Sequence, residues 1–379
     1  MTYRQSTKLA DGRELFYYDE QPGADRSAVD RRDLPATATS SQIRWDPLFR
    51  EWAIIAGHRQ SRTYKPPTSD CPLDPSRNGR LTEIPASDYD VVVFENRFPS
   101  LALGSGKQGP SLTMAAAGAL SDGDDLLIDE FPFRSAPGIG RCEVVCFTSD
   151  HDLSFAQLAP SRARTVIDAL ADRTTELSRL DGVEYVFCFE NRGEEIGVTL
   201  THPHGQIYAY PFVPSRFERA AEAAQSYQDE HGGCLQCAVV AAERAAGVRV
   251  VAESELWTAH VPFSARWPYE VRLVPHRHVP DLPSLTDEER DDLAGIYLDV
   301  LRRFDGLFGD GPTPYIASWQ QAPVHRLGAD VWHLAAEVFT IRRAPGKLKY
   351  LAGSESGAAV WINDVTPEVA AARLRGDPA

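Results

Sequence analysis

The sequence predicts an α+β fold made of two related half-barrel units, each with mostly antiparallel strands and one crossover helix. The first observation behind this prediction is that one order of elements, two strands, a helix and two strands, occurs twice along the chain. The second is that short apolar segments alternate with two long segments in which apolar residues recur at helical spacing. We expect the two units to form one continuous structure.

The first unit is expected over residues 44–214. Its strands are predicted at residues 89–94, 142–147, 185–189 and 206–210. A helix between the second and third of these strands is indicated by apolar residues that share one face, at Ala163, Val166, Ile167, Leu170 and Leu177.

The second unit is expected over residues 230–361, with strands at 256–261, 269–274, 315–319 and 337–341. Its helix should begin at the capping box from Thr286 to Glu289, because Ser or Thr followed three residues later by Glu satisfies two free N–H groups. Any α+β chain can be aligned loosely with itself, so chance similarity remains the alternative to a duplicated plan.

The two ends of the chain carry weaker patterns. Residues 1–43 are polar and rich in turn-forming residues, which predicts an N-terminal arm of irregular structure that could wrap onto a neighbouring chain. Residues 362–379 are expected to form a C-terminal tail.

Composition excludes several classes of protein. A net charge of −15 over 379 residues disfavours a nucleic-acid partner, although a few local arginines suffice for a small anion. The apolar runs are far shorter than a membrane span and the start lacks a basic and apolar leader, so we expect a cytoplasmic protein with no membrane partner. The six cysteines are expected to be reduced thiols, some of them available as metal ligands.

The most informative segment is Thr201-His202-Pro203-His204-Gly205-Gln206. An extended backbone with a proline between the two histidines places both imidazoles on one face. An imidazole is largely neutral at pH 7, attacks phosphorus well and leaves a phosphoramidate again without metal activation. We therefore predict that His204 is a nucleophile in a two-step transfer. A chance surface triplet, or a pair of zinc ligands, is the alternative for the three residues alone.

The residues that follow favour phosphoryl chemistry. Gly205 would let a phosphate approach the backbone, and the Gln206 amide could donate to a non-bridging oxygen in the transition state. Gln206 is no useful acid, which indicates a leaving group that departs without a proton, such as a sugar phosphate.

Together these motifs resemble the galactose-1-phosphate uridylyltransferase family, whose members are tandem proteins of the histidine-triad superfamily. The resemblance runs from about residue 44 to residue 375. The matching stretches are 46–47, 51–52, 58–62, 94–99, 149–151, 189–193, 202–206 and 349–355.

The resemblance implies a role for each matching residue. His204 would be the uridylylated nucleophile, Gln206 would contact the phosphoryl group, and His202 would bind zinc and position His204 through its carbonyl. The implied substrate contacts are Arg59 and Arg62 to phosphate in the partner subunit's site, Asn96, Arg97 and Phe98 to uridine, Asn191, Gly197 and Thr199 to the diphosphate, and Lys349, Tyr350, Ala352 and Glu355 to the sugar.

Structural explanations remain open for some of these residues. Arg59 and Arg62 could be solvated surface charges, and Phe98 could be a core aromatic. Asn191 could serve as a turn residue, since asparagine is favoured there on backbone grounds.

The first metal site implied by the resemblance departs from its usual pattern, because Asp74 stands where a second cysteine is expected. Cys71, Asp74, His151 and His202 would still offer one sulfur, one oxygen and two nitrogens, an acceptable set for Zn²⁺. Alternatively, the two histidines hydrogen-bond Asp74 directly and no metal is bound.

A second metal site of the family should be absent, because its positions carry Ala220, Gln320, Ala335 and Glu337. Glu337 also stands where a second nucleophile would be, so the second unit should not repeat the chemistry. A different zinc site is possible at Cys234, Cys237 and His278, with His333 or His276 as the fourth ligand; free thiols are the alternative.

The resemblance implies exchange between UDP-glucose and galactose 1-phosphate, giving glucose 1-phosphate and UDP-galactose, as in the Leloir pathway of galactose metabolism. It also implies a homodimer with active sites shared across the interface. Two alternatives remain: an adenylyltransferase or nucleotide-sugar phosphorylase on the same scaffold, and a non-catalytic nucleotide-binding relative.

Overall fold

The structure is a computed structural model. It describes residues 2–35, 41–61, 65–103, 126–128, 131–309, 311–325 and 331–377. Arg62, a predicted phosphate contact, lies outside these residues.

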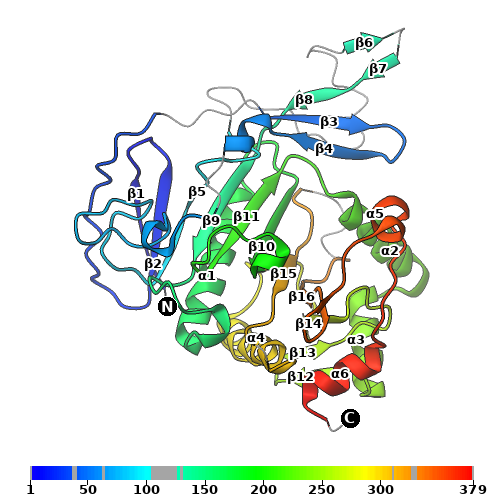
Figure 1. Ribbon diagram of the computed structural model, residues 1–379. Helices are drawn as coiled ribbons and strands as arrows, with labels where there is room; N and C mark the ends of the chain where they lie inside the picture. Colours follow the sequence, from blue (N-terminus) through cyan, green and yellow to red (C-terminus); the bar gives the residue numbers. More distant parts are fainter. Residues whose placement is uncertain are drawn as a thin grey trace.

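An eleven-stranded sheet in the order β1-β2-β5-β9-β11-β10-β15-β16-β14-β13-β12 organises the molecule, and each neighbouring pair in it is antiparallel (Figure 1). Its strands are β1 (Tyr3–Lys8), β2 (Glu14–Asp19), β5 (Val91–Glu95), β9 (Arg141–Cys146), β10 (Tyr185–Arg192), β11 (His204–Tyr210), β12 (Val250–Glu253), β13 (Trp257–His260), β14 (Tyr269–Pro275), β15 (Tyr315–Gln320) and β16 (Ala335–Thr340). The predicted α+β class is confirmed.

The duplicated plan is visible in the strand order. From its outer strand inward, the first unit runs β5-β9-β11-β10 and the second runs β13-β14-β16-β15. The equivalent strands β10 and β15 pair in the centre, with Glu190 opposite Ala317, so hydrogen bonding continues from one unit into the other. All eight predicted strands are present, with ends shifted by a few residues.

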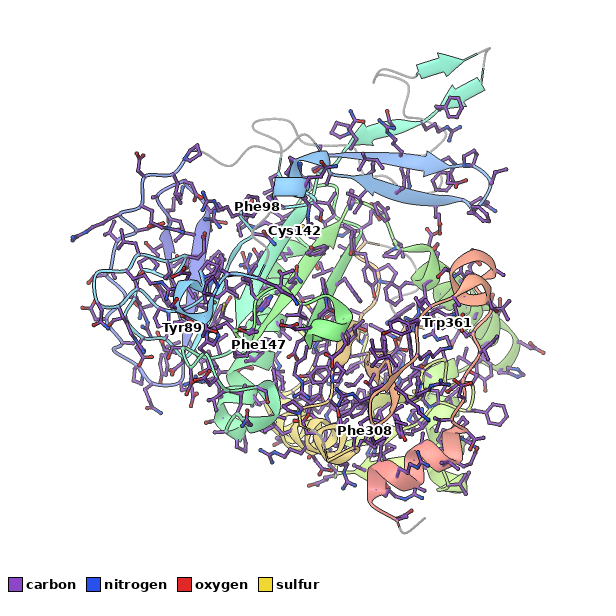
Figure 2. The ribbon with its side chains drawn as sticks, viewed as in Figure 1. Tyr89, Phe98, Cys142, Phe147, Phe308 and Trp361 are labelled. Carbon is purple, nitrogen blue, oxygen red and sulfur yellow. The ribbon has the colours of Figure 1, made fainter. Side chains whose placement is uncertain are left out.

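Two helices cover one face of the sheet, as the apolar spacing predicts. α1 (Pro160–Leu177) and α4 (Asp287–Gly306) lie side by side there. Between them and the sheet, Figure 2 shows densely packed side chains, among which Phe147 meets Phe155 edge to face at 4.9 Å. The expected capping box is confirmed: the Thr286 side chain accepts from the Glu289 N–H, and the Glu289 side chain accepts from the Thr286 N–H.

The predicted irregular arm is wrong in part, because residues 1–43 contain β1 and β2. β2 is almost fully buried and pairs with β5, while β1 forms the edge of the sheet. The polar composition of the segment misled the prediction because the outer strand β1 is exposed. The expected C-terminal tail likewise contains α6 (Pro367–Arg375), which buries Ala370, Ala371 and Leu374.

The remaining elements lie around the sheet. Strands β3 (Gln42–Asp46), β4 (Glu51–Ile55) and β8 (Ser135–Pro137) form a small sheet that projects from the body. The other elements are η1 (Gly57–Ser61), η2 (Thr68–Asp70), β6 (Leu126–Ile128), β7 (Phe131–Phe133), η4 (Phe155–Gln157), η5 (Glu194–Ile196), α2 (Ser215–His231), α3 (Leu235–Ala246), β17 (Arg342–Ala344), β18 (Lys347–Leu348) and α5 (Gly353–Ala358). No helix in the described part of the chain has the length and apolar character needed to cross a bilayer.

Candidate active site and metal clusters

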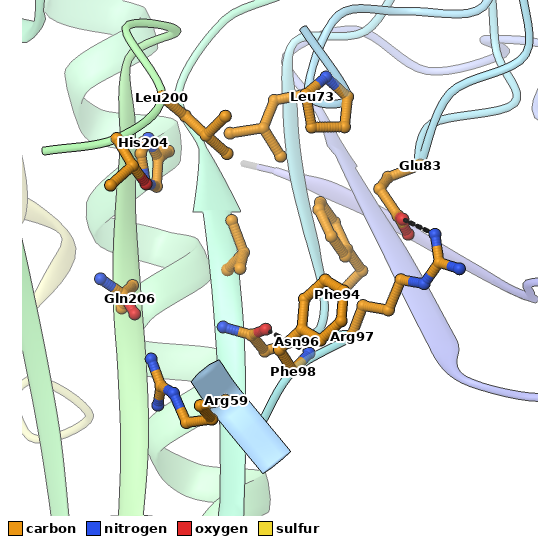
Figure 3. A pocket seen from close by; sticks show the side chains of 13 residues that line it. Arg59, Leu73, Glu83, Phe94, Asn96, Arg97, Phe98, Leu200, His204 and Gln206 are labelled. Carbon is orange, nitrogen blue, oxygen red and sulfur yellow. Dashed lines mark hydrogen bonds and ion pairs between the residues drawn. The ribbon is translucent and has the colours of Figure 1, made fainter. Parts of the chain in front are cut away.

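A pocket opens on the face of the first unit that α1 and α4 leave uncovered. Its lining comes from η1, β5, β9, β11, the turn after β5, and the loops before β5 and β11. Figure 3 shows His204 and Gln206 on one side, Glu83 and Arg97 on the other, and the rings of Phe94 and Phe98 between them. The lining residues are Arg59, Pro72, Leu73, Glu83, Phe94, Asn96, Arg97, Phe98, Val144, Thr199, Leu200, His204 and Gln206.

His204 begins β11 and is held by the backbone of the residue two positions before it. Its Nδ1–H donates to the His202 carbonyl oxygen at 2.8 Å. Because a carbonyl only accepts, this bond puts the proton of the neutral ring on Nδ1 and leaves a lone pair on Nε2. Burial lowers the pKa of His204, which favours the neutral ring. The pocket therefore presents a basic nitrogen at its edge.

Gln206 lies on the same strand face as His204, since alternate residues of a strand point the same way. Arg59, on η1, also lines this pocket, and its Nη1 lies 3.5 Å from the Tyr208 hydroxyl oxygen. The structure thus brings the predicted nucleophile His204, an amide and a guanidinium to one place. Arg59 lies at the site of its own chain, whereas the resemblance implied a contact in the partner subunit's site.

The opposite end of the pocket holds the predicted uridine contacts. The Asn96 side chain accepts from the Phe98 N–H at 2.8 Å, which fixes the turn after β5. Arg97 lies with its guanidinium 5.7 Å from the centre of the Phe98 ring and 3.9 Å from the Glu83 carboxylate. Phe98 lines the pocket and is partly exposed, so it is not a core aromatic.

The predicted diphosphate and sugar contacts are only partly brought to this pocket. Thr199 lines it, whereas Asn191, Gly197 and residues 349–355 are not among the described residues that do so. Lys349 and Glu355 instead form a buried ion pair at 2.7 Å beside α5, and Tyr350 is 74% exposed. In Figure 1, α5 lies at the other end of the molecule from β5.

The expected reason for Gly205 is wrong. Gly205 pairs with Glu190 on the face that the helices cover, and a Cβ there would lie 3.0 Å from the Phe147 ring and from the Phe189 carbonyl oxygen. A side chain at this position would point away from the phosphate. Close packing beneath the strand, rather than access of phosphate, requires a glycine here.

The residues of the first predicted metal cluster lie together, and one of them, His202, is two residues from His204. Ligand atoms of Cys71, Asp74, His151 and His202 all lie within 4.8 Å of one another. The Nε2–H of His202 donates to the Thr148 carbonyl at 2.8 Å, so its Nδ1 carries a lone pair and faces Asp74 Oδ1 at 3.0 Å. Two acceptors in contact require a cation or an additional proton between them. The donor set and this geometry fit zinc.

Asp74 Oδ1 lies within hydrogen-bond distance of Nδ1 of both histidines, the arrangement that the metal-free alternative expects. Burial alone would raise the pKa of its carboxyl, but close contact with the imidazoles of His151 and His202 outweighs burial and lowers it. The carboxylate is therefore the ionised group that a metal or an imidazolium would meet.

A second cluster lies at the start of α3. Cys234, Cys237, His278 and His333 place their ligand atoms within 4.8 Å of one another. His333 donates Nε2–H to the Pro275 carbonyl at 3.1 Å, which leaves its Nδ1 lone pair 3.2 Å from the Cys237 sulfur. His276 is bonded to Thr258 and to the Glu255 carbonyl, so the geometry selects His333 as the fourth candidate. Two sulfurs and two nitrogens suit tetrahedral zinc.

One position of the family's other metal site, Glu337, belongs to an ion-pair cluster. The buried carboxylate of Glu337 accepts two bonds from Arg216 Nη2, at 2.8 and 3.0 Å, and Arg266 and Arg272 lie within 3.5 Å of it. Three guanidinium groups thus surround Glu337, the residue at the position where the resemblance would place a second nucleophile.

Sequence patterns missed three residues of these sites. Glu83 lines the pocket, and the Tyr208 hydroxyl contacts the pocket residue Gln206, although both are remote from most of the motif residues in the sequence. Tyr89, just before β5, has its hydroxyl oxygen 2.9 Å from His202 Nε2. The period-two alternation His204, Gln206, Tyr208 was a signal for Tyr208, because it places all three side chains on one face.

Comparisons with known proteins agree with the motifs. The family described as galactose-1-phosphate uridyl transferase, N-terminal domain, matches residues 28–214, and the corresponding C-terminal domain matches residues 220–378. The galactose-1-phosphate uridylyltransferase of Streptomyces lividans is 47% identical over 381 residues, covering 98% of this chain and 97% of that protein. That of Thermotoga maritima is 38% identical, covering 88% and 98%.

Solved structures show the same fold. A uridylyltransferase structure superposes with a TM-score of 0.73 at 33% identity and covers 88% of this chain and 97% of that one. An ADP-glucose phosphorylase from Arabidopsis thaliana, with a TM-score of 0.63 at 21% identity over 90% of this chain and all of that one, shares the fold. Matches over nearly the whole chain, together with the nucleophile motif in its pocket, show that this chain is a nucleotidyltransferase of the galactose-1-phosphate uridylyltransferase family.

Proposed function

We propose that this chain transfers the uridylyl group (UMP) between hexose 1-phosphates, converting UDP-glucose and galactose 1-phosphate to glucose 1-phosphate and UDP-galactose through a uridylyl group on His204. The observation that carries the proposal is the hydrogen bond from His204 Nδ1–H to the His202 carbonyl, because it leaves the Nε2 lone pair at a pocket that also holds Gln206 and Arg59.

The reaction has two displacements. Nε2 of His204 attacks the α-phosphorus of UDP-glucose, the bond from that phosphorus to the bridging oxygen breaks, and glucose 1-phosphate leaves with the electron pair. A phosphate oxygen of galactose 1-phosphate then attacks the same phosphorus, and the nitrogen–phosphorus bond breaks. Neither leaving group needs a proton, which agrees with a lining that places an amide and a guanidinium beside the nucleophile.

The test is to trap the covalent intermediate. Enzyme incubated with UDP-glucose labelled in the uridine should retain acid-labile label without galactose 1-phosphate and release it when that substrate is added. His204→Gly should retain none. Label from ADP-glucose but not from UDP-glucose would support an adenylyltransferase or phosphorylase instead. A wild-type protein that binds UDP but takes up no label from either would support a binding protein.

We also propose that both metal clusters hold zinc. Zinc at Cys71, Asp74, His151 and His202 would fix the loop before β5 against the segment whose carbonyl orients His204. Zinc at the second cluster would tie the start of α3 to the loops after β14 and before β16. Bound zinc supplies positive charge and rigidity in both places.

Elemental analysis of the purified protein tests the zinc proposal. The wild type should contain about two equivalents of zinc. Cys71→Ser and Cys237→Ser should each lose one equivalent, and Cys188→Ser, a buried cysteine outside both clusters, should lose none. Equal zinc in all four proteins would reject these ligand assignments.

A homodimer with shared sites is the assembly that we propose. Within one chain, Lys349, Tyr350, Ala352 and Glu355 do not line the pocket, although the resemblance implies that they contact the sugar. A second chain could bring this segment to the pocket of the first. The cytoplasm remains the expected compartment.

A further inference from the structure

Tyr208 lies next to the active site and has no role in the reaction as described so far. It follows Gln206 by two residues on β11, so His204, Gln206 and Tyr208 share one face of the strand. Its ring meets Phe189 edge to face at 5.1 Å and Tyr210 at 5.9 Å. The aromatic neighbours hold the ring in place, and the hydroxyl reaches the amide of Gln206.

The hydroxyl of Tyr208 connects two pocket residues. It donates to Gln206 Oε1 at 3.1 Å, and it accepts from Arg59 Nη1 at 3.5 Å. A guanidinium can only donate, so the hydroxyl oxygen serves as the acceptor for Arg59 and its single hydrogen is available for the amide oxygen. Arg59 therefore determines the direction of the hydrogen bond between Tyr208 and Gln206.

This direction determines which end of the Gln206 amide faces the nucleophile. The amide has an accepting oxygen and a donating nitrogen, and these cannot exchange roles. Gln206 lies between His204 and Tyr208 along the strand, and Figure 3 shows it between His204 and Arg59. With the oxygen bound by Tyr208, the NH₂ group lies on the side toward His204. That is where the phosphoryl oxygens would be during transfer.

We propose that Tyr208 is a positioning residue, whose hydroxyl holds the Gln206 amide with its NH₂ group toward the phosphoryl group on His204. The proposal rests on the function proposed above for His204 and Gln206. Without the hydroxyl, the amide can rotate and present its oxygen to the negatively charged phosphoryl group. Loss of a whole transition-state donor typically costs about 10²–10³ in rate, so partial loss of orientation should cost about tenfold.

Tyr208→Phe removes the hydroxyl and keeps the ring. We expect kcat to fall about tenfold in both half-reactions, while KM stays within about twofold, because the amide acts on the transition state. Tyr210→Phe is the matched control, since Tyr210 lies on the same face one pair further along and has its ring against Tyr208 and Phe212. Unchanged kcat in Tyr208→Phe, or an equal loss in Tyr210→Phe, would reject the proposal.

A double variant separates positioning from a structural role. In a Gln206→Ala background, Tyr208→Phe should cause no further loss in the single-turnover rate of His204 uridylylation, because the amide it positions is absent. A further tenfold loss would mean that Tyr208 acts by another route and would reject the proposal. Retained transfer in His204→Gly would instead reject the proposed function, so the two failures are distinguishable.

Discussion

Two buried glutamates show how neighbouring charges decide the state of a side chain. Glu190 on β10 is fully buried and accepts a bond from the Tyr315 hydroxyl at 2.9 Å, and burial raises its pKa to about 7. Burial acts in the same direction on Glu337, but Arg216, Arg272 and Arg266 outweigh it and hold the pKa of Glu337 at about 2. Glu190 is therefore neutral in mildly acidic solution, whereas Glu337 is ionised.

Glu190→Gln should change how stability depends on pH. The folded pKa of Glu190 is raised above the ordinary value of 4.5, so the folded protein binds its proton more tightly than the unfolded chain does between pH 4.5 and about 7. The wild type should therefore lose stability across this window as pH rises. The variant has no carboxyl group at this position and should not show this loss. In the wild type, the loss in the free energy of unfolding amounts to up to about 3 kcal/mol between pH 4.5 and 8.

Urea unfolding of both proteins across this pH range measures the difference. The exposed Glu222→Gln serves as the control and should follow the wild type. Parallel stability curves for Glu190→Gln and the wild type would contradict an elevated pKa.

Glu337→Gln should be strongly destabilising at neutral pH. The change removes the negative charge that three arginines face and leaves their guanidinium groups partly buried without it. Breaking a buried ion pair from one side typically costs about 3–5 kcal/mol. Urea unfolding at pH 7 tests this, and a loss below about 1 kcal/mol would show that solvent already screens the cluster.

At the scale of elements, β11 joins packing to chemistry. The face of β11 away from the helices carries His204, Gln206 and Tyr208, which are partly buried, while Gly205, Ile207 and Ala209 pack on the side covered by the helices. A change in packing beneath the strand should therefore move the side chains on its other face.

Gly205→Ala tests this coupling. The added methyl group would lie 3.0 Å from the Phe147 ring and the Phe189 carbonyl oxygen, so the strand must shift, and overpacking of this kind typically costs about 1–3 kcal/mol. We expect lower stability together with a lower kcat. In α4, Gly295→Ala meets no atom within 4 Å and should instead stabilise the protein by about 0.5–1 kcal/mol. Full activity in a destabilised Gly205→Ala protein would show that the packing and the site are independent.

At the scale of the whole molecule, the predicted site residues form two groups. One lines the pocket, and the other surrounds the buried pair of Lys349 and Glu355 at α5. In a homodimer, the second group of one chain could lie at the pocket of the other chain. A two-fold axis would give both pockets the same contacts.

Hybrid dimers test the shared site. His204→Gly lacks the nucleophile, and Tyr350→Ala lacks an exposed side chain of the proposed sugar segment. If sites are shared, each variant alone should be impaired, but a co-expressed mixture contains hybrids in which one site has both residues intact. Random pairing should then restore about a quarter of wild-type activity. Activity no higher than the average of the two parents would place both residues in one chain's site.

Several features of this protein follow from the sequence by itself. The strands, the two long helices and the capping box at Thr286 were predictable because periodicity and capping depend on residues close together in the chain. The same holds for the bond from His204 to the His202 carbonyl, which joins residues two positions apart. The expected extended segment begins only at His204, because His202 lies in a bend before β11.

Contacts between distant segments were decided by the tertiary structure. Only the packing of η1 against the sheet brings Arg59 near Tyr208, and only sheet pairing places β2 beside β5. Only the packed loops select His333 over His276 at the second cluster. The sequence likewise cannot show that Gly205 faces Phe147, since register and burial depend on which strands pair and which helices cover them. Local patterns thus determined the elements and the proposed nucleophile, whereas long-range packing determined the neighbours around it.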